Sequence, residues 1–433
     1  MSSFSVKGLQ KPTSLFQRLH DVGQHEPRPI FPRPVLISEP CMGAATVSEA
    51  MHNWDVTYSP VNVYDKLGGL ESFHNFLFGD LSLTFMLGPR EGDLLKKALV
   101  GLKDSDGLIS GPPCPPWSTS GTQGGASDPR ARVFDRVIQW IIELAIRGLL
   151  LYFAIENVPG ILKQLAIQDN LAYMTILVDK LHAKIPFFQT WYRKLNESDT
   201  NIQSRERVWL LGLRKDVLKD ESPPEPLAVG ALEALQLEHV LDPDLPNMEA
   251  SDLPGNGSMA RNLRHYTEKI KAVVQADPRN MRLAIFDVDR SFDRTWSTRV
   301  MYDRVPTLTT KNRYLFLLSV TDLDLPPKDK MFHRLLHSKE RFVIQGRDPS
   351  LVNHVSTALA TKLTGNAFPV GMCERVVMPL LQRISKSQII GKDPRSHKLN
   401  QKALTDLAAR YPFVDPHPGR VASEPSNKRP RHA

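Results

Sequence analysis

Short apolar runs alternate with helix-length segments over the first half of the chain. Five such runs are VLIS (35–38), VTY (56–58), FLF (76–78), GLIS (107–110) and LLLYFAI (149–155). Alternation of strands and helices predicts βαβ units and a largely parallel sheet. The expected fold class is therefore α/β, with a mostly parallel sheet and helices on both of its faces.

The pattern changes at 185–213, where the runs IPFFQTWYRKL and RVWLLGL are joined by a polar connection. Both runs are rich in β-branched and aromatic residues, so we expect antiparallel strands at one end of the sheet. Two helices are also expected. One lies between Asp128 and Arg147, with Asp128 and Pro129 as N-cap and first-turn residues, and the other lies at about 371–385.

Composition narrows the class of protein. The chain has 433 residues, of which 41% are hydrophobic and 24% charged, as in a globular protein with more than one domain. Its net charge is +8, and the window 255–347 carries this excess, with 18 Lys and Arg against 10 Asp and Glu. Residues 216–252 are acidic and predict a solvated connector. With three cysteines we expect a reducing compartment, and we expect neither a signal peptide nor a membrane span.

The stretch GPPCPPWSTSGTQGG at 111–125 holds the first candidate for chemistry. Cys114 follows an apolar strand and is flanked by prolines, which restrict the backbone on both sides. A thiol on such a stiff turn points outward, and the glycines behind it suit a loop that opens and closes. An isolated Pro-Cys-Pro turn is more often structural, so the case depends on other residues nearby.

Two further segments supply a carboxyl group and guanidinium groups. Glu156 follows the LLLYFAI strand, and the carboxyl ends of parallel strands border one crevice, so Cys114 and Glu156 are expected to face the same pocket. The alternative for Glu156 is an acid that interacts with a helix N-terminus. In NIQSRER, Gln203, Arg205 and Arg207 alternate, which places both arginines on one strand face, with a solvated charged face as the alternative.

Three segments, in this order along the chain, resemble motifs of the cytosine-C5 DNA methyltransferase family. PPCPPWS is similar to its nucleophile motif, ENVPG to its glutamate motif and QSRER to its Gln-x-Arg-x-Arg motif. RVPTLTT (304–310), ERFVIQG (340–346) and TGNAFPVG (364–371) are similar to its late motifs. The resemblance implies a class I S-adenosylmethionine-dependent methyltransferase fold plus a smaller target-recognition domain. Five parts are expected: a flexible arm at 1–33, the catalytic domain at 34–215, an acidic connector and basic target-recognition region at 216–349, a segment returning to the catalytic domain at 350–390, and a disordered basic tail at 391–433.

The resemblance also implies a reaction, methyl transfer from S-adenosylmethionine to carbon 5 of a cytosine in double-stranded DNA. Cys114 would attack carbon 6 of a cytosine flipped out of the duplex, which makes the ring nucleophilic at carbon 5. Glu156 would hydrogen-bond the ring N3 and amine, and Arg205 would lie near the ring O2. The expected DNA contacts are Ser118, Gln203, Arg207, Arg290, Arg294 and Arg299.

For the cofactor S-adenosyl-L-methionine, the chain departs from the family's pattern. The family's first motif carries several glycines, whereas SEPCMGAATVSEA at 38–50 keeps Gly43 and has alanines beside it. After the second strand, Ser59 and Asn62 stand where the family has an acid for the ribose. We expect cofactor binding, weakened on the nucleotide side. The candidate cofactor-binding residues are Glu39, Gly43, Asp80 and Asn366.

Three other functions stay open. The first is an RNA-directed (tRNA) cytosine-C5 methyltransferase. The second is a catalytically weak DNA-binding regulator that kept the methyltransferase fold, and the third is an inactive scaffold. The intact set of Cys114, Glu156 and Arg205 argues against the last two. KRPR at 428–431 predicts nuclear import, with a cytoplasmic location expected if the source is prokaryotic. No metal site is expected.

Overall fold

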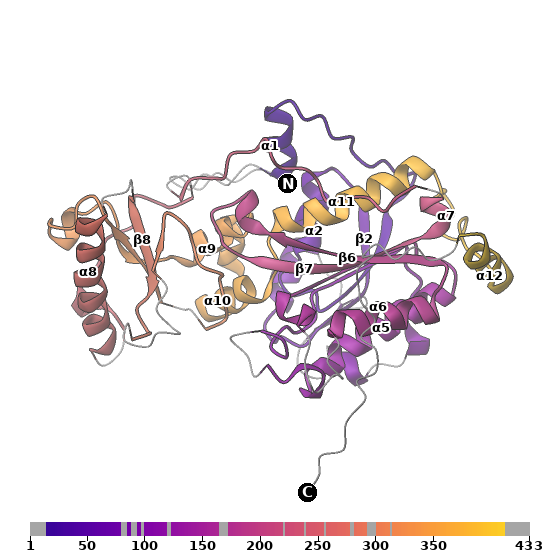
Figure 1. Cartoon of the computed structure of the whole chain (residues 1–433), viewed down its shortest axis with the longest axis horizontal. Coiled ribbons are helices and arrows are strands. Elements are labelled where there is room, and N and C mark those ends of the chain that lie inside the picture. Colours follow the sequence, from indigo (N-terminus) through magenta and orange to yellow (C-terminus); the bar gives the residue numbers. More distant parts are fainter. Residues whose placement is uncertain are drawn as a thin grey trace, which may run out of the picture.

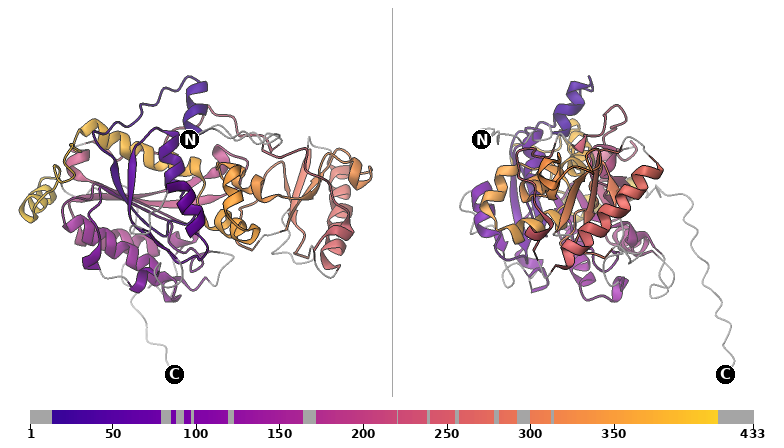
Figure 2. Two further views of the ribbon diagram at one scale, coloured as in Figure 1. Left: turned by 180° about the vertical axis from the view of Figure 1, so that it is seen from behind. Right: turned by 90° about the vertical axis from the view of Figure 1, so that its left-hand side faces the viewer.

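Two sheets lie along the long axis of the molecule, a large one in the main body and a small one beside α8 at the far end (Figure 1). Figure 2 shows the same division from behind. The computed structural model describes residues 14–78, 85–87, 93–96, 99–118, 123–163, 172–219, 221–237, 240–254, 257–277, 281–291, 300–311 and 314–411.

The large sheet has the strand order β3-β2-β1-β4-β5-β7-β6. Neighbouring strands are parallel except at β7, which runs antiparallel to both β5 and β6. The prediction of a mostly parallel sheet that ends in antiparallel strands is therefore confirmed. The strands are β1 (Val35–Pro40), β2 (Tyr58–Asp65), β3 (Phe85–Leu87), β4 (Gly107–Ser110), β5 (Tyr152–Asn157), β6 (Phe188–Asn196) and β7 (Glu206–Arg214).

Helices cover both faces of the large sheet, as the sequence predicts (Figures 1 and 2). One buried core joins α5, α6 and α12 to the sheet, and a second joins α1, α2 and α11 to its other face. The predicted helices correspond to α5 and α11, although the N-cap of α5 is Arg130 rather than Asp128. The helices of the main body are α1 (Leu15–Asp21), α2 (Thr46–Asn53), α3 (Glu71–Phe78), α5 (Ala131–Ile146), α6 (Tyr173–Lys184), α7 (Lys215–Leu218), α11 (Val370–Ser387) and α12 (Gln401–Arg410).

Two apolar runs lie elsewhere than predicted. FLF at 76–78 was expected to be a strand but forms the end of α3, because a three-residue apolar run does not distinguish helix from strand. VTY at 56–58 meets only the beginning of β2, which continues to Asp65. Pro60 and Asn62 interrupt the apolar pattern and so hide the second half of this strand. As a result, Asp65 is the last residue of β2.

The small sheet is antiparallel throughout, in the order β11-β10-β8-β9. α8 packs on one face, where the rings of Tyr266 and Phe286 stack with centroids 4.4 Å apart. The segment 216–252 was expected to be solvated, yet Val240 and Leu241 are buried in the core on the other face, because apolar side chains lie between its acidic residues. The elements are β8 (Leu283–Asp287), β9 (Met301–Tyr302), β10 (Leu315–Ser319), β11 (His333–Leu335) and α8 (Ser258–Ala276).

The chain returns from the small sheet to the main body through α9 (Ser338–Ile344) and α10 (Thr357–Asn366), with a 3-10 turn, η10 (Pro349–His354), between them. The end of α10 lies directly against the loop that follows β9. A Cβ at Gly365 would lie 2.4 Å from the backbone nitrogen of Thr310, so only glycine permits this approach. Two segments 55 residues apart are thereby held together at the junction of the sheets.

The Cys114 turn is in close backbone contact with the segment that follows β5. A Cβ at Gly160 would lie 1.9 Å from the carbonyl oxygen of Trp117, well inside van der Waals distance. Trp117 itself is buried, and its ring stacks on Tyr173 with centroids 4.9 Å apart. Gly160 therefore allows the turn after β4 to lie against the end of β5.

We expect Gly160→Ala to lower the free energy of unfolding by about 3 kcal/mol, because the added methyl group forces the Trp117 backbone away. Chemical denaturation measures this change. Gly230→Ala is the matched control, since a Cβ there meets nothing within 4 Å. Equal stability of the two variants would show that the close approach at Gly160 is absent.

α1 docks on the main body, although it belongs to the segment expected to be a flexible arm. Leu15 and Leu19 are buried in the core beside α2 and α11. Nη1 of Arg18 donates to the Thr200 carbonyl at 2.6 Å, and Nη2 donates to the Glu233 carbonyl. Below α1 lies a cavity of about 30 Å³, which is room for about two water molecules.

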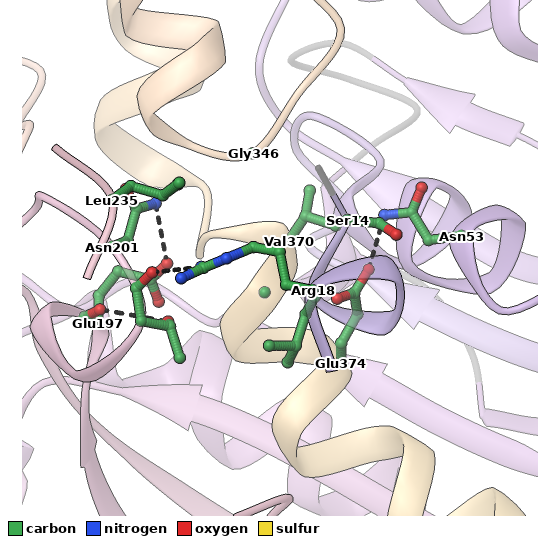
Figure 3. A pocket seen from close by; sticks show the side chains of 12 residues that line it. Ser14, Arg18, Asn53, Glu197, Asn201, Leu235, Gly346, Val370 and Glu374 are labelled. Atoms are coloured by element: carbon green, nitrogen blue, oxygen red, sulfur yellow. Dashed lines mark hydrogen bonds between the residues drawn. The ribbon is translucent and has the colours of Figure 1, made fainter. Parts of the chain in front are cut away.

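Two buried carboxyl groups line this cavity, together with Arg18 (Figure 3). Burial raises the pKa of Glu197 to about 7, and Asn201 and Arg375 work against this rise. Burial also raises the pKa of Glu374 to about 8, although Asn53 donates to its Oε1 at 2.6 Å. Both pKa values lie above the usual 4.5, so the folded chain binds more protons here than the unfolded chain between pH 4.5 and about 8. Stability therefore falls as the pH rises through this range.

We expect Glu374→Gln to reduce this loss of stability, because the amide needs no proton to remain neutral. Between pH 5.5 and 8.5 the free energy of unfolding should fall by about 3 kcal/mol less in the variant than in the unmodified protein. Urea titrations at both pH values give the comparison. Glu268→Gln, on the exposed face of α8, is the control and should follow the unmodified protein. If the free energy of unfolding fell with pH as steeply in Glu374→Gln as in the unmodified protein, this carboxyl would be ionised in the folded state.

Candidate active site

Cys114 lies in a tight turn just beyond β4. The backbone amides of Trp117 and Ser118 both donate to its carbonyl oxygen at 3.0 Å, which closes the turn. The amide of Gly125 donates to Pro116 at 2.9 Å, so the far end of the following loop returns to the same turn. The proline-flanked backbone and these bonds hold the half-buried thiol at the carboxyl edge of the sheet.

Glu156 lies on the neighbouring strand, and its carboxyl group is buried. The register of β4 and β5 pairs Ser110 with Ile155, so Glu156 comes opposite the first residue beyond β4. A Cβ at Gly111 would lie 3.5 Å from Oε2 of Glu156, which places the carboxyl group beside the chain that leads to Cys114. The predicted proximity of the two strand ends follows from this register.

Arg207 forms the ion pair of the site. Its Nε contacts Oε1 of Glu156, and both side chains are more than nine-tenths buried. The pairing follows from the antiparallel register of β5 and β7, in which Glu156 lies opposite Trp209. Arg207 is the diagonal neighbour two residues away on the same strand face, within reach of a long side chain. Glu156 therefore faces a fixed positive charge.

Arg205, predicted to lie near the substrate ring, has other partners. Its Nη1 donates to the Leu308 carbonyl at 2.9 Å and its Nη2 to the Ala367 carbonyl at 2.7 Å. Burial, and after it the nearby charge of Arg207, lower the pKa of Arg205 to about 9. Arg205 thus ties the start of β7 to the loop after β9 and to the end of α10.

The charges of these groups act on the thiol of Cys114. Burial raises the pKa of Cys114, and the negative charge of Glu156 adds to this rise, whereas Arg207 and Arg205 lower it. The four side chains are therefore close enough to influence one another electrically. A half-buried thiol, a carboxyl and a guanidinium group converge where β4 and β5 end and the antiparallel β7 begins.

The predicted DNA contacts are dispersed. Gln203 is fully buried, and its Oε1 accepts a bond from Nε2 of Gln345 at 3.1 Å. Ser118 is half-buried beside Cys114, and Arg290 pairs with Asp287 at 3.2 Å in the turn after β8. The remaining predictions that lie outside the described residues are Asp80, Arg294, Arg299 and the KRPR run.

The loop between β1 and α2, Cys41–Ala45, lies at the carboxyl edge where the sequence predicts cofactor binding. Cys41, Gly43 and Ala45 have φ values of 60°, 55° and 56°, so two residues with side chains adopt the left-handed conformation that favours glycine. Each costs about 1–2 kcal/mol relative to an ordinary conformation. The substitutions seen in the sequence thus preserve the glycine-like backbone rather than remove it.

Asp65 is a site residue that the sequence analysis missed. It ends β2 and is half-buried; its Oδ2 accepts from the Gly43 amide at 2.7 Å and its Oδ1 from the Leu67 amide at 2.8 Å. A carboxylate has about four acceptor positions, so Asp65 keeps capacity for further donors. Asn62 is buried; both N–H groups of its amide donate, to Ser38 Oγ and to the Lys103 carbonyl, and its Oδ1 already accepts from the Lys103 amide. The correct end of β2 would have pointed to Asp65.

The other two predicted cofactor residues differ in position. Glu39 is buried, which raises its pKa to about 8, and it interacts with Tyr58 and with Cys373 of α11. It therefore faces the packed helices, a location that the alternation of β1 explains. Asn366 is exposed and ends α10. Of the predicted set, Gly43 lies in the loop, and the side chain of Glu39 lies on the packed face of β1.

Within the described residues, no group of three or more His, Cys, Asp or Glu side chains could hold a metal ion. None of the helices described combines the length and the apolar character that crossing a membrane requires.

Comparison with a solved structure supports the fold. The methyltransferase EhMeth of Entamoeba histolytica superposes with a TM-score of 0.50 over 80% of this chain and 98% of that one, at 14% sequence identity. At this identity the likeness concerns the fold alone. It confirms the predicted fold of S-adenosylmethionine-dependent methyltransferases, with its mostly parallel sheet.

Sequence comparisons identify the family. The type II methyltransferase M.FnuDI of Fusobacterium nucleatum is 25% identical over 314 residues, which cover 70% of this chain and 83% of that protein. The type II methyltransferase M.MthTI of Methanothermobacter thermautotrophicus is 32% identical over 138 residues, 30% of this chain and 39% of that protein. These relatives are prokaryotic and give the predicted nuclear location no support. The family model for C-5 cytosine-specific DNA methylases matches residues 89–382, and the chain belongs to this family of DNA cytosine-5 methyltransferases.

Proposed function

We propose that the chain transfers a methyl group from S-adenosylmethionine to carbon 5 of a cytosine held outside a DNA duplex, through a covalent bond to Cys114. The observation that carries the proposal is the convergence of three groups. The Cys114 thiol lies at the same sheet edge as the buried pair of Glu156 and Arg207, and all three influence one another electrically. A nucleophile next to a matched acid and cation suits addition to an electron-poor ring.

Cys114 acts first in the proposed mechanism. In the free protein, burial raises the pKa of its thiol, so the thiol form is favoured until a substrate arrives. The thiol proton passes to water, and the sulfur electron pair then bonds to carbon 6 of the ring and moves electron density to carbon 5. Once carbon 5 carries the methyl group, water removes its proton, and the electrons of that bond re-form the double bond between carbons 5 and 6. The bond between carbon 6 and sulfur breaks at the same time, and the released thiolate takes up a proton from water.

Glu156 and Arg207 stabilise the charge that develops on the ring. In this proposal the Glu156 carboxyl accepts from the ring amine and donates its proton to N3 as charge develops there, and the Arg207 guanidinium donates to the ring O2. We assign the O2 role to Arg207 in place of Arg205, because both terminal nitrogens of Arg205 already donate to backbone carbonyls. The preformed ion pair requires little reorganisation during the reaction.

The residues of the β1–α2 loop and the end of β2 fit S-adenosylmethionine. The spare acceptor positions of the Asp65 carboxylate suit the ribose hydroxyls, and the glycine-like backbone around Gly43 permits close approach of a ligand. When bound, the cofactor supplies an electrophilic methyl group. In this proposal Asp65 replaces Ser59 and Asn62 as the ribose-binding residue.

The target-recognition role belongs to the small sheet and to the turn after β8. This part of the chain carries the basic excess, and Arg290 lies there with a partly exposed side chain. Arg and Lys side chains neutralise DNA phosphates. Buried Gln203 positions the β7 strand through Gln345 and is not assigned a DNA contact.

A duplex that contains 5-fluorocytosine should trap the proposed adduct, because fluorine at carbon 5 prevents the last elimination. Incubated with S-adenosylmethionine, the protein should form a complex stable to denaturing electrophoresis, and Cys114→Ser should form none. The same duplex with ordinary cytosine is the control. If only a 5-fluorocytosine RNA of the same sequence is trapped, DNA is the wrong substrate. An adduct with the serine variant would remove Cys114 as the nucleophile.

Replacing each of the two arginines should have a different main effect, one on kcat and the other on the free energy of unfolding. Arg207→Gln should lower kcat by about 100-fold, as loss of a charge-stabilising donor does. Arg205→Gln should lower the free energy of unfolding by about 2 kcal/mol, because it leaves two buried carbonyls without donors. Single-turnover methylation and urea denaturation measure the two effects. A larger loss of kcat in Arg205→Gln than in Arg207→Gln, at unchanged stability, would return the O2 role to Arg205.

A further inference from the structure

The β1–α2 loop is held by three side chains that lie outside it. Two of them follow the loop within a few tens of residues and bind backbone groups of Gly43. Asp65 accepts from the Gly43 amide at 2.7 Å, and Nε2 of His74 lies 3.0 Å from the Gly43 carbonyl. The third contact comes from Arg347, some 300 residues away in the turn between α9 and η10.

Arg347 contacts the β1–α2 loop at the point where the loop leads into α2. Its Nη1 donates to the Ala44 carbonyl at 2.5 Å, and its Nη2 donates to Oγ1 of Thr46. Thr46 in turn donates to the Phe368 carbonyl at 3.1 Å, which joins the same point to the segment after α10. These bonds enclose Ala45, one of the two residues of this loop that have a side chain and adopt the left-handed conformation.

The position of Arg347 is electrostatically unfavourable. Its side chain is fully buried, and burial lowers its pKa. It also lies at the first turn of α2, where the helix dipole already places positive charge. Glu49 offsets part of this cost at 3.5 Å. A buried cation at a helix N-terminus adds little stability, so its effect on the loop conformation is the better explanation for its presence.

We propose that Arg347 is a positioning residue for S-adenosylmethionine, which holds the β1–α2 loop in its binding conformation. A glycine at position 45 would adopt a φ of 56° without strain, whereas alanine needs an external restraint. Arg347 supplies that restraint through the carbonyl before Ala45 and the hydroxyl after it. The proposal depends on the proposed function for the identity of the ligand, but not for the restraint of the loop.

The test compares Arg347→Lys with Arg214→Lys in the full-length protein. Both arginines are fully buried and donate to backbone carbonyls, but Arg214 bonds to Gly148 and His397, far from the loop. Lysine reaches only one of the two acceptors, and we expect Arg347→Lys to weaken S-adenosylmethionine binding by about tenfold through lost preorganisation. KM should rise with kcat nearly unchanged. Arg214→Lys should leave both unchanged, apart from lower thermal stability.

A second readout requires no cofactor. Hydrogen exchange of the peptide that contains residues 41–46 should become faster in Arg347→Lys and remain unchanged in Arg214→Lys. The double variant Arg347→Lys with Ala45→Gly should regain most of the lost affinity, because glycine adopts the loop conformation without the restraint.

The possible failures are distinguishable. If Arg347→Lys exchanges at the normal rate in this loop, or if Ala45→Gly restores no affinity, Arg347 is not a restraint and the inference is wrong. If the unmodified protein shows no S-adenosylmethionine binding in calorimetry, the proposed cofactor is wrong. Faster loop exchange in Arg347→Lys would in that case still support the restraint.

Discussion

The buried ion pair between Glu156 and Arg207 is the interaction on which the rest of the site depends. Two charges removed from water are tolerated only when they are paired with good geometry, and the register of β5 and β7 provides that pairing. A parallel strand in the place of β7 would present its residues in the opposite order along β5. The single reversal of direction in the sheet therefore has a chemical consequence, because it places a guanidinium group opposite a carboxyl group beside Cys114.

The same strand is tied to the second part of the molecule. Arg205 donates to carbonyls of the loop after β9 and of the end of α10, and Gln203 bonds to Gln345 just after α9. These buried polar contacts cross between segments more than 100 residues apart in sequence. They couple the position of Arg207 to that of the small sheet, since both depend on the beginning of β7. The small sheet and the edge of the large sheet that carries Glu156 and Arg207 thus share one mechanical connection.

The sequence predicted what depends on local pattern. The sheet, the antiparallel pair and the strand-end positions of Cys114 and Glu156 follow from apolar runs and their limits. It did not separate Arg205 from Arg207, because alternation puts both on one strand face and only the tertiary fold decides which one meets Glu156. It missed Asp65 because Pro60 and Asn62 interrupt the apolar pattern of β2, so the strand was not predicted to continue to residue 65. Arg347 was beyond reach for a different reason, since its partners are about 300 residues away.

The altered glycine motif keeps its backbone conformation, which is held by side-chain contacts instead of by glycine residues. A backbone with positive φ needs glycine only if nothing else holds it there. Here the conformation at Cys41, Gly43 and Ala45 is kept, while its polar groups are bound by Asp65, His74 and Arg347. The restraint comes from segments that also form the junction with the small sheet, because Arg347 follows directly on α9. The loop is therefore tied to that junction through Arg347, whereas a loop stabilised by glycine alone would have no such connection.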